Sequence, residues 1–285
     1  MTVPQVIVLA GLGINCERET AAAFRMAGAD ADIVHINALC ADATRLRDAV
    51  VLAFPGGFSF GDQLGAGQAL ANRIRHRALT DGRTLLAHIA SFIENGGYVL
   101  GVCNGFQVLA KLGLLPNIGG TCTQEVALAH NASGRFENRW CRLLPACEGP
   151  AAPFGALGMI ELPSRHGEGR VVFRDAAIRH EVIERSLNWL TYVEADGRPA
   201  TGFPENPNGA DLACAGLTDV SGRVIGLMPH PEAFVSLYTH YDWSGTLRSD
   251  PDTPDIGDGL HLIRILVHKA SAAHKAPPIA AKEEL

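Results

Sequence analysis

Three short stretches of the 285-residue sequence combine side chains that could carry out nucleophilic catalysis. Cys103 lies in a Gly-Val-Cys-Asn-Gly stretch, and His230 and Glu232 lie in a Met-Pro-His-Pro-Glu stretch. Gly57 lies in a Pro-Gly-Gly-Phe stretch that ends an apolar run. A cysteine nucleophile needs a base, and the base needs a group that orients it. The stretches therefore predict a thiol nucleophile, an imidazole base, a carboxylate partner and backbone donors for an oxyanion.

The stretch around Cys103 follows an apolar run and precedes a helical pattern, which is typical of a strand–turn–helix nucleophile elbow. Such a tight turn needs small residues two positions before and after the nucleophile. The start of a helix presents unpaired N–H groups and a positive dipole end, which stabilise an anionic sulfur. The N–H of Asn104 could then bind an oxyanion. The alternative is a structural cysteine between two packing glycines.

His230 and Glu232 stand two positions apart in a segment that two prolines hold extended. Side chains at that spacing point the same way, so the carboxylate can fix the imidazole tautomer. Gly57 allows the backbone to approach a ligand and to present its N–H. Taken alone, the glycine pair also fits a plain turn. Beside Cys103, Gly57 would complete an oxyanion hole.

The elements that must position these residues alternate along the first half of the chain. Short apolar runs predict strands, and Ala-rich or amphipathic segments ended by Gly predict helices. The strands are predicted at 6–10, 31–36, 49–54 and 98–102, and the helices at 16–27, 67–77, 84–94 and 106–112. This alternation predicts an α/β fold with a mostly parallel central sheet and helices on both faces. Ligands of such sheets bind beyond the carboxyl ends of the strands, where Gly57 and Cys103 fall.

The second half is less regular. Strands are predicted at 140–144 and 170–173, a hairpin joins 212–218 to 224–228, and a helix covers 259–274. Pro and Gly punctuate residues 145–163, which we expect to form a surface insertion. We expect residues 1–275 to form one domain and residues 276–285 to form a disordered tail.

The composition argues against a nucleic-acid-binding, a membrane-spanning or a secreted protein. The net charge is −6 and the pI is near 6.0, which argues against nucleic acid as the main ligand. No apolar run approaches the ~20 residues of a membrane span, and no signal peptide is evident. The seven cysteines form no C-x-x-C pair, which predicts reduced thiols, mostly in the core, of a cytoplasmic protein. The histidines show no ligand-like spacing, so no metal is expected.

Together the catalytic stretches resemble the class I, triad-type glutamine amidotransferases. Within that class, the chain resembles the family of glutaminase subunits of phosphoribosylformylglycinamidine synthases over roughly residues 5–235. The stretches that carry this closer resemblance are residues 13–19, 55–62, 133–140, 166–170 and 206–209. The last three read Ser-Gly-Arg-Phe-Glu-Asn-Arg-Trp, His-Gly-Glu-Gly-Arg and Asn-Pro-Asn-Gly.

The resemblance implies roles for individual residues. Cys103 is the nucleophile, His230 its base and Glu232 the partner of the base. Gly57 and the N–H of Asn104 bind the oxyanion. Gln107, four positions after the nucleophile, contacts the substrate amide. The implied reaction hydrolyses glutamine to glutamate and ammonia through a cysteinyl thioester.

The resemblance also implies partners. Ammonia would pass to an ATP-dependent synthetase subunit that converts formylglycinamide ribonucleotide to its amidine, with or without a small bridging subunit. The sequence has no G-x-x-x-x-G-K-[ST] loop, so we expect no cofactor in this chain and place ATP and Mg²⁺ on the partner. His166 and Arg170 have no derivable role, and we expect them at the active-site mouth or facing the partner.

Two departures from the family pattern are visible. Ala233 follows Glu232 where many relatives carry Arg, and a C-terminal extension begins after Tyr238. Three alternatives stay open from the sequence: an amidotransferase subunit of another synthetase, a cysteine hydrolase of another kind, or a non-catalytic module that kept the fold.

Overall fold

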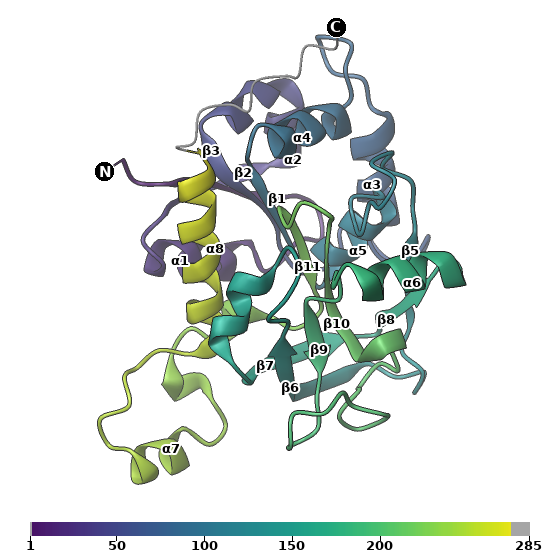
Figure 1. The fold of residues 1–285 in the computed structure, drawn as a ribbon. Coiled ribbons are helices and arrows are strands. Elements are labelled where there is room, and N and C mark those ends of the chain that lie inside the picture. Colours follow the sequence, from purple (N-terminus) through teal and green to yellow (C-terminus); the bar gives the residue numbers. More distant parts are fainter. Residues whose placement is uncertain (1, 275–285) are drawn as a thin grey trace, which may run out of the picture.

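The computed structural model describes residues 2–274 and places a nine-stranded mixed sheet at the centre of the molecule (Figure 1). Five neighbouring strands run parallel, and the sheet continues through antiparallel pairs. The strand order is β2 (Asp30–His35), β1 (Gln5–Ala10), β3 (Ala49–Phe54), β4 (Tyr98–Val102), β11 (Val224–Leu227), β10 (Cys214–Thr218), β9 (Leu190–Tyr192), β6 (Glu137–Pro145) and β7 (Ile160–His166).

The parallel half forms because its central strands are apolar along their whole length. Every residue of β3 and β4 is buried, as expected for strands covered on both faces. Figure 1 shows α1 and α8 on one side of the sheet and α3 and α5 on the other. The helices of this half are α1 (Glu17–Met26), α2 (Ile36–Ala41), α3 (Gln68–His76), α4 (Leu85–Glu94), α5 (Asn104–Lys111) and α8 (Asp258–His274). This arrangement confirms the predicted α/β class with a mostly parallel sheet.

The antiparallel half confirms the predicted hairpin, because β10 pairs with β11. The strands predicted at 140–144 and 170–173 correspond to β6 and to β8 (Glu168–Phe173). The sequence did not predict β7, β9, β5 (Val126–His130), which pairs with β8 in a separate two-stranded sheet, or the helices α6 (Ala176–Glu184) and α7 (Trp243–Ser249).

The surface insertion expected at residues 145–163 does not extend over the whole segment: most of its residues are at least partly exposed, but several are buried. Phe154 is fully buried, and its ring centroid lies 5.0 Å from that of Trp189. Ile160 begins β7, which pairs with β6 inside the central sheet. Pro163 is compatible with this strand because β7 is the edge of the sheet, where a missing N–H breaks no ladder.

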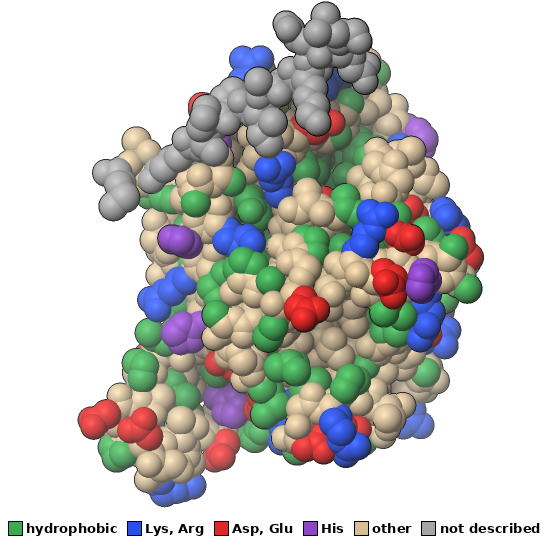
Figure 2. All heavy atoms as spheres, viewed as in Figure 1, with side chains coloured by type: hydrophobic (Ala, Val, Ile, Leu, Met, Phe, Trp, Pro, Cys, Tyr) green, Lys and Arg blue, Asp and Glu red, His purple; other side chains and the backbone are tan. Residues whose placement is uncertain are grey.

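Charged side chains of both signs lie on the surface of the described residues. Figure 2 shows acidic and basic side chains interspersed over one face rather than gathered into a basic patch. Within residues 2–274, no helix is both long and apolar enough to cross a membrane. The predicted tail at 276–285 lies outside the described residues, and the single domain over 1–275 stays a prediction.

Candidate active site

Cys103 occupies a strained turn between β4 and α5. Its φ of 51° lies in the left-handed region, and its N–H donates to the carbonyl of Leu227 at 2.8 Å. A Cβ on Gly105 would lie 1.9 Å from the carbonyl oxygen of Phe54, and one on Gly101 would lie 2.8 Å from the backbone of Gly105. The backbones on both sides of the turn therefore leave room only for glycine. This is the elbow geometry that the spacing predicted.

His230 and Glu232 form a buried pair in the loop that follows β11. The His230 Nδ1 lies 2.6 Å from Glu232 Oε1, and the two side chains are 4% and 2% exposed. The N–H of His230 donates to the carbonyl of Pro163 at 2.8 Å, which ties the loop to β7. The carboxylate accepts the Nδ1 proton, so in the neutral ring the other nitrogen, Nε2, carries the lone pair and is the one that takes up a second proton.

Electrostatics favour the charged form of this imidazole. Burial alone favours neutral His230, but the Glu232 carboxylate and the Cys103 sulfur outweigh burial and raise its pKa well above the usual value. Among the described residues, His230 Nε2 has no hydrogen-bond partner. An imidazole of this kind can hold a proton beside an anionic sulfur and release it to a leaving group.

One cavity of about 440 Å³ brings the predicted residues together at the carboxyl edge of the parallel strands. Cys103 and His230, more than a hundred positions apart in the chain, both line it. Gly57 and Gln107 also line the cavity, whereas Asn104 and Glu232 are not among its lining residues. The described structure therefore places thiol and imidazole in one site.

Gly57 reaches the cavity through a backbone that only glycine fits. Its φ is 145°, and a Cβ would lie 2.5 Å from the carbonyl oxygen of Gly13. Gly57 and Ile14 face each other in an isolated antiparallel β-bridge. The hydrogen bonds of this bridge are made by the flanking residues: the Phe58 N–H donates to the Gly13 carbonyl, and the Asn15 N–H donates to the Gly56 carbonyl. In such a pair the N–H of Gly57 itself points away from the bridge and is available to a ligand.

Asn104 and Gln107 form a hydrogen-bond network behind Cys103. Asn104 Oδ1 accepts from the Ser59 N–H at 3.0 Å, and its Nδ2 donates to Gln107 Oε1 at 2.9 Å. Gln107 Nε2 donates to the carbonyl of Glu168. The network holds the loop after Gly57 against the start of α5, so the two backbone donors keep a fixed relation. The Gln107 amide is used within the protein, and its contact with substrate stays a prediction.

Cys16 lines the cavity, whereas the sequence predicted an ordinary core cysteine at this position. It is half-buried and follows β1, at the same sheet edge as Cys103. Its position after a strand that ends in Gly-Leu-Gly was the available signal. Among residues 2–274, one group of side chains has potential metal-ligand atoms that all lie within 4.8 Å of one another. It consists of Cys16, His230 and Glu232. Within this set, His230 Nδ1 and Glu232 Oε1 are already hydrogen-bonded to each other.

The other cysteines follow the expected pattern with one exception. All seven are free, and the thiols of the predicted core positions are mostly buried, but Cys147 is exposed. Its position in the loop after β6 explains the exposure.

Two carboxylates give the far side of the cavity negative charge. Asp62 and Glu168 both line it, and Glu168 Oε2 accepts from the Ala66 N–H at 3.2 Å. Burial, followed by the charge of Glu168, raises the pKa of Asp62. A cationic group on a ligand would stabilise the charged form of both carboxylates. Neither residue was predicted, although Glu168 lies in the His-Gly-Glu-Gly-Arg stretch.

His166 and Arg170 separate in the structure. His166 ends β7 and lines the cavity, as expected of a residue at the active-site mouth. Arg170 lies in β8, where it pairs with Ala129 of β5, and it is absent from the residues that line the cavity. Whether Arg170 faces a partner stays a prediction.

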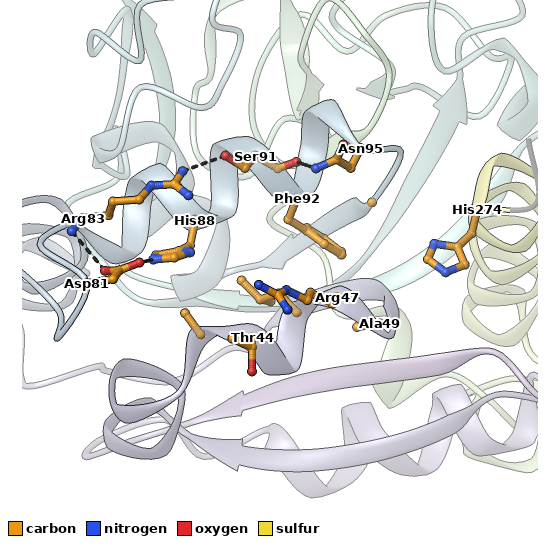
Figure 3. A pocket seen from close by; sticks show the side chains of 13 residues that line it. Thr44, Arg47, Ala49, Asp81, Arg83, His88, Ser91, Phe92, Asn95 and His274 are labelled. Atoms are coloured by element: carbon orange, nitrogen blue, oxygen red, sulfur yellow. Dashed lines mark hydrogen bonds and ion pairs between the residues drawn. The ribbon is translucent and has the colours of Figure 1, made fainter. Parts of the chain in front are cut away.

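A second cavity of about 440 Å³ lies at the opposite edge of the sheet, near the start of β3. Figure 3 shows its polar side chains joined to one another: Asp81 pairs with His88, and Arg83 donates to Ser91. Among the described residues that line it there is no cysteine. The first cavity is therefore the candidate active site.

Comparisons with known proteins agree on one family. Residues 3–261 match the family described as the CobB/CobQ-like glutamine amidotransferase domain. The chain is 41% identical over 239 residues to the phosphoribosylformylglycinamidine synthase subunit PurQ of Methanococcus maripaludis, covering 83% of this chain and 84% of the relative. It is 38% identical over 262 residues to that of Dehalococcoides mccartyi, covering 92% and 96%. A solved structure, PurLQS from Thermotoga maritima, matches with a TM-score of 0.65 at 28% identity, covering 93% of this chain and 98% of that one.

Proposed function

This chain belongs to the CobB/CobQ-like glutamine amidotransferase family, and from that premise we propose that it is the glutaminase subunit of a phosphoribosylformylglycinamidine synthase. It hydrolyses glutamine and supplies the ammonia to a synthetase subunit. The observation that supports this most directly is the shared cavity of Cys103 and the His230–Glu232 pair.

The first half of the reaction forms a thioester. The Cys103 thiolate attacks the side-chain amide carbon of glutamine, and the N–H groups of Gly57 and Asn104 hold the resulting oxyanion. His230 gives its Nε2 proton to the amide nitrogen, the carbon–nitrogen bond breaks, and ammonia leaves. The Glu232 carboxylate stabilises the imidazolium before the transfer and holds the neutral ring in position afterwards.

The second half regenerates the Cys103 thiolate. Neutral His230 accepts a proton from water, which attacks the thioester carbon. The carbon–sulfur bond then breaks, glutamate leaves, and the thiolate–imidazolium pair is restored. General acid–base work by such a histidine typically contributes ~10²–10⁴ in rate.

The cavity also suits the amino-acid end of glutamine. The carboxylates of Asp62 and Glu168 complement an α-ammonium group, and their mutual repulsion falls when a cation binds between them. We expect glutamine with a blocked α-amino group to be a poor substrate.

We propose the partners, the cofactors and the location of this chain by analogy with its relatives. PurLQS from Thermotoga maritima places a relative of this chain in a multi-subunit assembly. We expect a synthetase subunit that binds ATP and Mg²⁺ and amidates formylglycinamide ribonucleotide, with a small bridging subunit. The seven free cysteines suit the reducing cytoplasm, which we propose as its location.

The test uses the complex of this chain with its synthetase subunit. Replacement Cys103→Ala should abolish the glutamine-dependent reaction and leave the ammonia-dependent reaction intact. Cys147→Ala, at an exposed thiol outside the cavity, is the matched control and should retain both. Unchanged glutamine hydrolysis in Cys103→Ala would refute the proposal. Rescue of a purine-requiring strain that lacks this subunit separates it from an amidotransferase of another synthetase.

A further inference from the structure

We propose that Nε2 of His166 accepts a hydrogen bond from the carboxamide N–H of bound glutamine and thereby makes the site select an amide over a carboxylate. The inference rests on the proposed function and adds a specificity-determining residue to it.

The end of β7 brings His166 beside the nucleophile. The carbonyl oxygen of Arg165, the preceding residue, lies 3.6 Å from the Cys103 sulfur. His166 itself is 3% exposed and lines the same cavity as Cys103 and His230. Among the described residues, its Nε2 has no hydrogen-bond partner. A buried, unpaired ring nitrogen in a substrate cavity points to a partner that the substrate supplies.

Asn131 fixes the tautomer of this imidazole. Its Oδ1 lies 3.1 Å from His166 Nδ1 and also accepts from the Gly169 N–H at 3.2 Å. Its Nδ2 donates at 2.8 Å to the carbonyls of Arg135 and His166. These backbone contacts identify which end of the Asn131 amide is the oxygen and which is the nitrogen. Because the oxygen faces His166, Nδ1 of His166 must carry the proton and donate it. The Nε2 atom is therefore an acceptor.

The ring stays neutral and in place. Burial, followed by the charge of nearby His230, lowers the pKa of His166 to about 4, so the acceptor lone pair persists at neutral pH. A Cβ on Gly169 would lie 2.5 Å from the ring, which shows how closely the backbone packs against it. Asn208, from the Asn-Pro-Asn-Gly stretch, donates to the Gly169 carbonyl at 2.8 Å and holds that backbone.

The groups already assigned to the reaction do not supply an acceptor for the substrate nitrogen. The N–H groups of Gly57 and Asn104 serve the carbonyl oxygen of the substrate. The Gln107 amide is bonded within the protein, and Nε2 of His230 serves proton transfer. The substrate NH₂ group still needs an acceptor. Glutamate presents an oxygen there, and two lone pairs would face each other without a proton between them.

The experiment compares two substrates in the complex of this chain with its synthetase subunit. L-glutamine has a side-chain N–H to donate, whereas the γ-methyl ester of L-glutamate has none. His166→Phe should lower kcat/KM for glutamine by about 10–100-fold and leave that for the ester nearly unchanged. Inhibition by glutamate should become tighter. His166→Gln, whose amide oxygen can accept, should recover part of the glutamine activity, and His166→Leu replaces the Phe variant if that does not fold.

Three outcomes decide the matter. An equal fall in kcat/KM for both substrates would show that His166 only supports the fold of the site. An unchanged kcat/KM for both would show that His166 does not contact the substrate. Either result would overturn the inference. A wild-type complex that hydrolyses neither substrate would overturn the proposed function itself.

Discussion

Acidification to about pH 5 should destabilise the fold through one buried histidine, His166. Burial and the charge of His230 lower the pKa of His166 from its usual 6.5 to about 4. A histidine whose pKa is depressed in the folded state contributes its full stability above pH 6.5. This stability is lost as the pH falls from 6.5 toward about 4. In that range the unfolded chain binds a proton that the folded chain does not.

The size of the effect follows from the two pKa values. The gap between 6.5 and about 4 corresponds to ~3 kcal/mol of unfolding free energy in full, of which ~2 kcal/mol is lost by about pH 5. His230 does not add to this loss, because its pKa is raised. The contribution of His230 to stability is complete below pH 6.5, and it disappears only as the pH rises through the pKa of His230 in the folded state.

Urea unfolding, followed by the fluorescence of buried Trp189, measures the free energy at about pH 7.5 and pH 5. The wild type should lose ~2 kcal/mol more than His166→Gln between the two values. His180→Gln, an exposed histidine on α6, is the control and should behave as the wild type. An equal loss in the wild type and in His166→Gln would refute the assignment of a neutral, buried His166.

Three other substitutions test the site more locally. Glu232→Gln keeps a hydrogen bond to His230 but removes its charge, so kcat/KM should fall by about tenfold or more and the alkaline loss of activity should begin at lower pH, as a pH–rate profile would show. Gly105→Ala, whose Cβ meets a β3 carbonyl, should lower the melting temperature, whereas Gly202→Ala, with open space around its Cβ, should not. Asn104→Ala leaves two hydrogen-bonding groups unpaired and should lower kcat by about 10–100-fold without loss of the folded state by circular dichroism. Unchanged kinetics in Glu232→Gln or Asn104→Ala, or equal melting of the two glycine variants, would contradict these expectations.

The parallel half of the fold was predictable because its signals are local. Residues 49–54 and 98–102 are apolar without interruption, and such runs have few alternatives to a strand buried on both faces. The antiparallel half was harder to predict. Strand β9 is three residues long, and β7 contains Pro163, which weakens the strand signal although an edge strand tolerates it.

The same distinction applies to the site. The elbow at Cys103 and the His230–Glu232 pair are encoded within five residues each, so their chemistry could be read before their positions were known. The role of His166 depends on Asn131, which reaches it across a contact between distant strands. The two carboxylates and Cys16 belong to the cavity only through the way loops from separate strands converge. Local patterns mark some of these positions, as the Gly-Leu-Gly turn before Cys16 does, but they do not place the side chains in one cavity.

The most direct test of the account is to trap the covalent intermediate. The wild-type complex is mixed with glutamine and quenched in acid, and its cysteine-containing peptides are weighed by mass spectrometry. The account predicts a glutamyl group on the peptide that contains Cys103 and on no other peptide. Glutamine hydrolysis without that adduct, or with the glutamyl group on Cys16 instead, would contradict it.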